Sequence, residues 1–76
     1  MKKYYLTYAR QDEDGLSCGL HSIGSLQYCR KVAKTLINLE ADEDKPIYHD
    51  TYYTGAEFYE ATLPGGGTLL LTIECK

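Results

Sequence analysis

The sequence lacks tryptophan, and it also lacks any hydrophobic run long enough to cross a membrane. A membrane-spanning helix needs about 18 or more consecutive apolar residues. The longest apolar-rich run, residues 69–73, has the length of a strand. The charged segment of residues 1–5 is not followed by the apolar stretch that is typical of a signal peptide. We therefore expect a cytoplasmic protein without a membrane-spanning helix.

Basic residues are scarce relative to acidic ones. Eight lysines and arginines stand against eleven aspartates and glutamates, which gives a net charge of −3 with neutral histidines. Domains that bind nucleic acid are normally basic, so this balance argues against direct binding of nucleic acid. The three cysteines are an odd number, and without a signal peptide we expect reduced thiols instead of a disulfide framework. A chain of 76 residues has room for one core, so residues 1–76 are expected to form a single domain.

The N-terminal segment predicts a β-hairpin. The polar segment 11–15 ends in Asp-Gly, a dipeptide that is typical of tight turns. Residues 2–10 before it and residues 16–20 after it alternate in character, as strands with one buried face do. The inward side of the first strand is expected to be formed by Tyr4, Leu6 and Tyr8.

One helix is predicted after this hairpin. Ser25 is a suitable N-cap, and apolar residues recur at spacings of three and four from residue 26 to residue 37. This spacing places them on a single stripe of a helix. The pattern fades near Glu40, and Pro46 bars a helix from continuing further.

The last thirty residues predict a meander of three strands. These strands cover residues 47–53, 57–63 and 68–75, separated by segments that contain glycine. The third alternates most clearly, so we expect it near the centre of the sheet. Its inward side is expected to be formed by Leu69, Leu71, Ile73 and Cys75. The whole pattern predicts an α+β fold, with one antiparallel sheet of four or five strands and one amphipathic helix packed on one face.

Eight residues are tyrosine, and most of them fall in the predicted strands. Successive side chains of a strand point to opposite faces, so not all of these rings can enter one core. An exposed tyrosine among carboxylates suits a surface that binds a partner. The candidates for this role are Tyr5, Tyr48, Tyr52 and Tyr53.

The cysteines and histidines raise the alternatives of a metal site and of a catalytic thiol. Cys18 and His21 have a spacing found at zinc sites, and a ligand set could be completed by Cys29, His49 and Cys75. Structural zinc sites usually combine two closely spaced pairs, and this chain has one. Cys18 with either histidine could also form a nucleophile and base, but so small a domain leaves little room for a substrate cleft. We therefore expect no metal, no cofactor and no enzymatic activity.

Two acidic clusters are the best candidates for a functional surface. They comprise residues 12–14 and residues 42–44, with Glu40 beside the second. Such clusters are often solvated loops. Together with tyrosines, however, they could dock into a basic groove of another protein, with charge steering the encounter and aromatic rings supplying the strongest contacts. Basic grooves of this kind often evolved to hold nucleic acid, so acidic side chains can occupy them competitively.

In size, charge and expected architecture, the whole chain resembles small inhibitor proteins of phages and mobile elements, including anti-CRISPR proteins. Many of these are compact, acidic α+β proteins that cover a nucleic-acid channel or an assembly surface. The resemblance involves no residue motif. It implies a mode of action and assigns no role to any residue.

We therefore predict a non-enzymatic protein-binding module that docks on the basic surface of a partner protein, such as a nucleoprotein effector complex. The main alternative is a homo-oligomer, with a homodimer as the simplest form, that buries surplus tyrosine and apolar surface. A small zinc-binding or nucleic-acid-binding domain, the latter using a basic helix face at Arg30, Lys31 and Lys34, is less favoured. The predicted partner-binding residues are Asp12, Glu13, Asp14, Asp42, Glu43, Asp44, Tyr5, Tyr48, Tyr52 and Tyr53.

Overall fold

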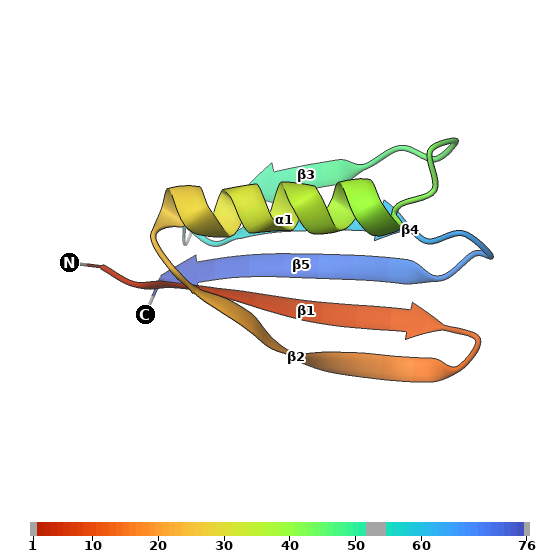
Figure 1. The fold of residues 1–76 in the computed structure, drawn as a ribbon, viewed down its shortest axis with the longest axis horizontal. Helices are drawn as coiled ribbons and strands as arrows, with labels where there is room; N and C mark the ends of the chain where they lie inside the picture. Colours follow the sequence, from red (N-terminus) through yellow and green to blue (C-terminus); the bar gives the residue numbers. More distant parts are fainter. Residues whose placement is uncertain (1, 52–54, 76) are drawn as a thin grey trace.

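The computed structural model describes residues 2–51 and 55–75, which form one sheet and one helix (Figure 1). The elements are β1 (Tyr4–Asp12), β2 (Gly15–Gly24), α1 (Leu26–Glu40), β3 (Tyr48–Thr51), β4 (Glu57–Thr62) and β5 (Thr68–Cys75). The sheet has five strands in the order β2-β1-β5-β4-β3, and every neighbouring pair is antiparallel. The predicted α+β class with one antiparallel sheet is therefore confirmed.

The β1–β2 hairpin closes at the acidic turn that the sequence indicated. Glu13 and Asp14 form the turn, and the backbone N–H of Asp14 donates to Oδ1 of Asp12 at 2.9 Å. Gly15 follows with φ of +124°, a conformation that side chains with a Cβ rarely adopt. The Asp-Gly dipeptide thus fits this turn, because the N–H of Asp14 finds an acceptor in Asp12 and Gly15 adopts the positive φ that the turn requires.

Strand β2 is longer than predicted, and a ring from β1 packs over the glycine in its middle. The ring of Tyr8 lies against Gly19, with its nearest atoms 3.5 Å from the position that a Cβ would occupy. A ring over a strand glycine supplies the packing that the missing side chain cannot. The pairing with β1 shifts between Leu6 and Thr7, where His21 of β2 is the extra residue of a bulge.

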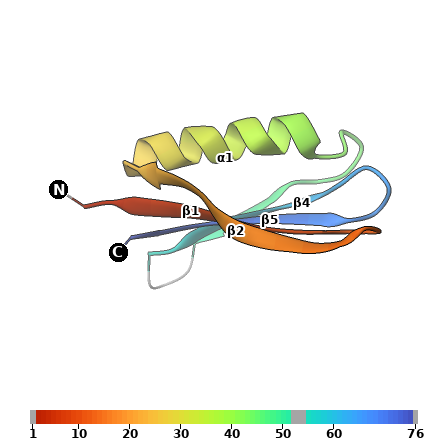
Figure 2. The same cartoon turned by 60° about the horizontal axis from the view of Figure 1, so that its bottom comes forward.

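Helix α1 begins and ends as the sequence predicts. The side chain of Ser25 accepts a hydrogen bond from the N–H of Tyr28 at 3.1 Å, as an N-cap does. At the other end, the N–H of Ala41 donates to the carbonyl of Ile37 at 2.8 Å. Figure 2 shows the sheet nearly edge-on, with α1 across one side of it.

The core lies between α1 and the sheet, and among the strands the central β5 contributes the most buried apolar residues. The buried apolar residues of the core are Leu6, Cys29, Ala33, Ile37, Tyr59, Ala61, Leu63, Leu69, Leu71 and Ile73. The prediction that residues 68–75 form a strand near the sheet centre is confirmed. Cys75 was expected to face inward and is exposed instead, because it lies at the strand end beyond the last buried residue, Ile73. The predicted strand 47–53 is observed as Tyr48–Thr51, and residues 52 and 53 lie outside the described part.

The sheet face away from α1, here called the open face, is not covered by any described element (Figure 2). Strand β1 presents Tyr5, Thr7, Ala9 and Gln11 there, opposite their partners on β2. Those β2 partners are Ile23, Leu20, Cys18 and Leu16. Leu16, Leu20 and Ile23 are 72%, 53% and 48% exposed, so this face retains accessible apolar surface along one edge.

Candidate functional site

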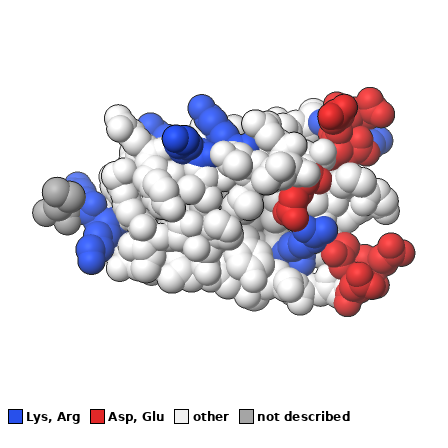
Figure 3. All heavy atoms as spheres, in the orientation of Figure 1, with Lys and Arg blue, Asp and Glu red and all other residues white. Residues whose placement is uncertain are grey.

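The two acidic clusters lie at the same end of the molecule, although about thirty residues separate them in the chain. The N–H of Asp42 donates to the carbonyl of Thr62 at 2.8 Å, which fixes the second cluster at the end of β4. Thr62 pairs with Thr68, and Thr68 pairs with Gln11 beside the first cluster. Figure 3 shows the acidic side chains gathered at this end. We call it the acidic end; it comprises Asp12, Glu13, Asp14, Glu40, Asp42, Glu43 and Asp44.

Arg10 connects the β1–β2 hairpin to the end of the helix. Its Nη1 lies 2.6 Å from Oε1 of Glu40, and its Nε lies 3.2 Å from Oδ2 of Asp12. The hydrogen bond to Asp12 and then that to Glu40 raise the pKa of Arg10 above its ordinary value. The acidic end also holds Lys45, whose N–H donates to the carbonyl of Asp42 at 3.1 Å. Seven carboxylates with these two cations leave a pronounced local negative charge.

Within each cluster, the first carboxylate organises the loop and the next two project from it. Asp12 accepts the N–H of Asp14, and Asp42 accepts the N–H of Asp44 at 3.0 Å, which are two examples of the same local turn. The side chains at both of these acceptor positions are half-buried. The exposed carboxylates that follow them are Glu13, Asp14, Glu43 and Asp44.

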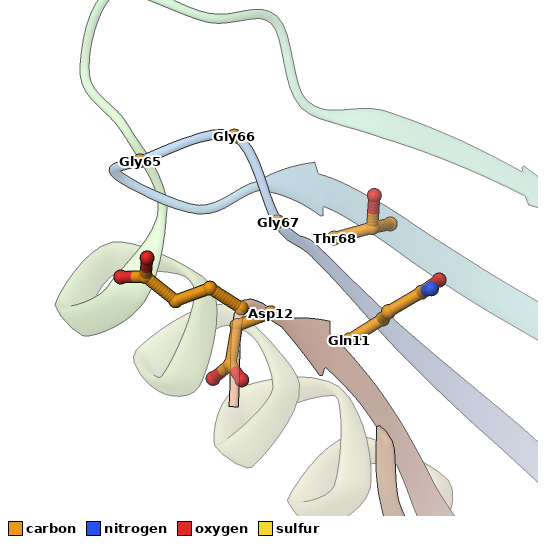
Figure 4. Close-up of a pocket in the computed structure, with 7 residues that line it drawn as sticks. Gln11, Asp12, Gly65, Gly66, Gly67 and Thr68 are labelled. Atoms are coloured by element: carbon orange, nitrogen blue, oxygen red, sulfur yellow. The ribbon is translucent and has the colours of Figure 1, made fainter. Parts of the chain in front are cut away.

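A polar hollow of about 330 Å³ separates the β1–β2 turn from the β4–β5 turn (Figure 4). Its lining comprises Gln11, Asp12, Glu13, Gly65, Gly66, Gly67 and Thr68. Figure 4 shows the side chains of Gln11 and Thr68 on neighbouring strands, with the Asp12 carboxylate directed to the helix side. The β4–β5 turn approaches β1 so closely that a Cβ on Gly67 would collide with the carbonyl oxygen of Gln11.

The predicted tyrosines do not all join the acidic end. Tyr48 is 55% exposed on the open face. Its partner on β4 is Glu60, two residues before Thr62, to which the second cluster is fixed. The Tyr48 hydroxyl donates to Oδ2 of Asp50 at 3.0 Å, and the Tyr48 ring centroid lies 5.6 Å from that of Phe58. Tyr5 lies at the opposite end of β1, about 23 Å from Asp12 at the usual rise per strand residue. Tyr52 and Tyr53 lie outside the described residues.

A second polar cluster, which the sequence reading missed, lies beside the helix. Glu57 is a buried carboxylate on β4, and Arg30 of α1 donates to both of its oxygens. The ring of His49 stacks on that of Tyr59, with centroids 4.3 Å apart, and its Nε2 lies 3.9 Å from Oε1 of Glu57. Burial, followed by the charge of Glu57, raises the pKa of Tyr59. Arg30 donates to both oxygens of Glu57, so this arrangement holds the helix to the sheet.

Arg30 therefore differs from its expected role in a basic helix face, since Glu57 neutralises it. The signal that could have revealed the pair is the position of Glu57, which falls on the same side of its predicted strand as Tyr59 and Ala61. A carboxylate at an inward position needs a partner, and a helix arginine is a common one.

The cysteine and histidine residues do not converge. Cys18 is exposed on the open face, whereas Cys29 is buried in the core and its thiol donates to the carbonyl of Tyr4 at 3.6 Å. Burial raises the pKa of the Cys29 thiol. Nδ1 of His21 lies 2.7 Å from the hydroxyl of Ser22. Across residues 2–51 and 55–75, no group of three or more His, Cys, Asp and Glu side chains could hold a metal ion.

Comparison of the chain with protein-family models, with curated proteins and with solved structures found no match. Within the described residues, no helix has the length and apolar character needed to cross a membrane. Function is therefore inferred from the arrangement of the side chains alone.

Proposed function

We propose that this protein is a non-enzymatic binding module that docks its acidic end on a basic surface of a partner protein. The observation that carries this proposal is the convergence of residues 12–14 and 42–44 at one end of the sheet. Two acidic loops that serve only solubility do not have to lie side by side, whereas a docking surface requires charge concentrated over a continuous area.

The acidic end combines fixed and accessible carboxylates. Asp12 and Asp42 hold their turns through backbone hydrogen bonds, so the exposed carboxylates next to them are presented from defined backbone positions. Pre-organisation of this kind lowers the entropic cost of association. The hollow beside Glu13 offers space for a lysine or arginine side chain of the partner, and Tyr48 on the nearby β3 edge adds an aromatic contact.

The partner surface that best fits is one built to bind nucleic acid. Such a surface carries clustered lysine and arginine residues that bind phosphates, and carboxylates can pair with the same side chains. Occupation by this protein would then exclude the nucleic acid. This mode of action corresponds to an inhibitor of the phage type, similar to anti-CRISPR proteins, that acts in the cytoplasm on a nucleoprotein effector complex.

Two charge-reversal variants test the proposal. Glu43→Lys alters the acidic end, and Glu74→Lys alters an exposed carboxylate of β5 that pairs with Tyr5 at the opposite end of the sheet. The two variants have the same net charge and the same substitution type, so a difference between them reports location. Each is immobilised, exposed to lysate of the source cells, and analysed by mass spectrometry of the retained proteins.

We expect the wild type and the Glu74→Lys variant to retain the same basic protein, and the Glu43→Lys variant to retain much less of it. Raising the salt concentration should weaken retention by the wild type, because the charges involved are exposed to solvent. Added single-stranded or double-stranded nucleic acid should displace the protein. Equal retention by both variants, or retention that is insensitive to salt and nucleic acid, contradicts the proposal.

A further inference from the structure

Strand β2 is an unprotected edge of the sheet. Gly15–Gly24 pairs with β1 on one side, and its other side faces no described strand (Figure 1). Natural edge strands usually carry lysine, proline or other charges, or are very short, because an open backbone edge pairs readily with another chain. The ten residues of β2 include no lysine, arginine, aspartate, glutamate or proline. The opposite edge, β3, has four residues and includes Asp50, so the two edges differ in this protection.

The side chains next to this open edge are apolar as well. Leu16 and Leu20 of β2 are 72% and 53% exposed, and both lie on the open face. Large aliphatic side chains on a sheet edge gain from burial by about 25 cal/mol for each Å² of apolar surface removed from water. The backbone and the side chains of β2 therefore favour the same event, the addition of a further strand.

We propose that the added strand is β2 of a second copy of this chain, paired antiparallel, so that two sheets join into one continuous sheet. Two identical antiparallel strands are related by a two-fold axis perpendicular to the sheet, which is the symmetry of most protein dimers. Rotation about this axis keeps each face on its own side. Both helices then cover the same face of the joined sheet, and both open faces merge on the other.

The side-chain pattern selects a register. Residues directly opposite each other in adjacent strands lie on the same face, so one residue must lie opposite its own copy, with the two-fold axis midway between the two. The regular part of β2, before the bulge at His21, is Gly15–Leu20. Pairing of Cys18 with Cys18 of the second copy places Leu16 opposite Leu20 of that copy, and the two-fold axis between the two cysteines repeats this leucine pair on its other side.

The charges of the molecule favour this antiparallel arrangement over a parallel one. The acidic Glu13–Asp14 turn precedes β2, whereas Gly24 at the other end of β2 pairs with Tyr4, next to the exposed Lys2 and Lys3. Antiparallel pairing directs the acidic turn of each copy toward the basic end of the other. Parallel pairing would place two acidic turns side by side, where like charges repel.

The oligomeric state tests the proposal directly. Size-exclusion chromatography with multi-angle light scattering should give the wild type the mass of a dimer at concentrations of tens of micromolar, a range typical of modest interfaces. Leu16→Lys places a charge on the pairing edge and should give a monomer. Leu39→Lys is the matched control, because Leu39 is a leucine on α1 that is 76% exposed, and this variant should remain a dimer.

The register is tested through the thiols. Residues opposite each other on antiparallel strands have Cα atoms about 4.5–5.5 Å apart, which a disulfide can bridge. Copper-catalysed oxidation by air transfers two electrons and two protons from the two Cys18 thiols to oxygen and forms one bond between the copies. Cys75→Ser should still give this covalent dimer, whereas Cys18→Ser should not, although Cys18 and Cys75 are both exposed.

A wild-type protein that stays monomeric at millimolar concentration overturns the proposal, and so does a dimer that Leu16→Lys leaves intact. Circular dichroism of each variant shows whether the fold is kept, and Leu20→Lys provides an independent disruption if Leu16→Lys does not fold. The dimer does not depend on the proposed function. Loss of the dimer in Leu16→Lys with retained partner binding, or loss of partner binding with a retained dimer in Glu43→Lys, which leaves the Glu13–Asp14 turn unchanged, separates the two.

Discussion

Arg30 and Glu57 form a two-pronged ion pair between helix and sheet, with Nε 2.9 Å from Oε2 and Nη2 2.8 Å from Oε1. The Glu57 side chain is 8% exposed, so its charge depends on this partner for compensation. The hydrogen bonds to Glu57 raise the pKa of Arg30 above its ordinary value. A buried carboxylate that loses its partner is destabilising, whereas removal of an exposed lysine changes little.

Arg30→Ala should therefore lower the urea midpoint of unfolding clearly more than Lys31→Ala, its exposed neighbour on the same helix. Both variants remove one positive charge and both introduce a strong helix former, so the comparison isolates the contact with Glu57. Equilibrium unfolding followed by circular dichroism measures the midpoints. Equal midpoints for the two variants would show that the ion pair adds nothing to stability.

The three thiols should react at two different rates. Cys18 and Cys75 are exposed, whereas Cys29 is buried in the core, where burial raises its pKa and so disfavours the reactive thiolate. With a disulfide reagent such as Ellman's reagent, we expect two fast thiols and one that reacts at least about tenfold more slowly, at the rate of local opening. Urea should make all three equivalent. Three fast thiols in the folded protein would contradict the packing described for α1.

Gly67→Ala should destabilise the fold by about 1–3 kcal/mol, the usual range for overpacking a tight contact. The new methyl group would collide with the carbonyl of Gln11, and Gly67 is not among the glycines with positive φ, so the effect is steric. Gly19→Ala is the control, because its Cβ would meet the Tyr8 ring at an ordinary 3.5 Å. We expect this control to change stability by less than about 0.5 kcal/mol. Chemical unfolding of both variants measures the difference.

The stability of the protein should fall above pH 10 in a way that depends on Tyr59. Burial, followed by the charge of Glu57, raises the pKa of Tyr59 above its ordinary value of 10.0. A pKa that is raised in the folded state contributes stability below the unfolded value, and this contribution is lost as the pH rises through the folded value. Between pH 9 and pH 11, Tyr59→Phe should therefore lose less stability than the wild type. Parallel losses in the two proteins would show that the Tyr59 hydroxyl is accessible to water.

Local patterns in the sequence predicted the helix and strands that bury one apolar face in the core. The stripe from residue 26 to residue 37, with Ser25 before it, predicted α1 because helix periodicity and capping act over a few residues. The alternation in residues 68–75 predicted both β5 and its place at the sheet centre. Cys75 departed from its pattern because alternation specifies a face and does not specify how far the core extends along it.

These local patterns could not predict contacts between residues that are distant in the sequence. The length of β2 depends on pairing with β1 and on the Tyr8 ring over Gly19, neither of which its own composition reveals. Arg30 and Glu57 are 27 residues apart. The acidic end exists because β5 lies between β1 and β4, so that the β1–β2 turn and the loop after α1 reach the same end. Composition singled out the two acidic clusters, and the strand order shows that they lie at one end of the sheet, whereas Tyr5 lies at the opposite end of β1.

The central position of β5 has a consequence for how the chain acquires its structure. β1 and β4 do not pair with each other, and each is joined to the rest of the sheet through β5, the last strand to be synthesised among those described. While the ribosome translates the earlier strands, the β1–β2 hairpin and the β3–β4 pair share no strand pairing, and contacts such as that of Arg30 with Glu57 are what connects the helix to β4. The contacts that unite them span most of the chain, which is a feature of slow folding. We therefore expect a single late, cooperative transition, and no stable native-like intermediate on the nascent chain before β5 leaves the exit tunnel.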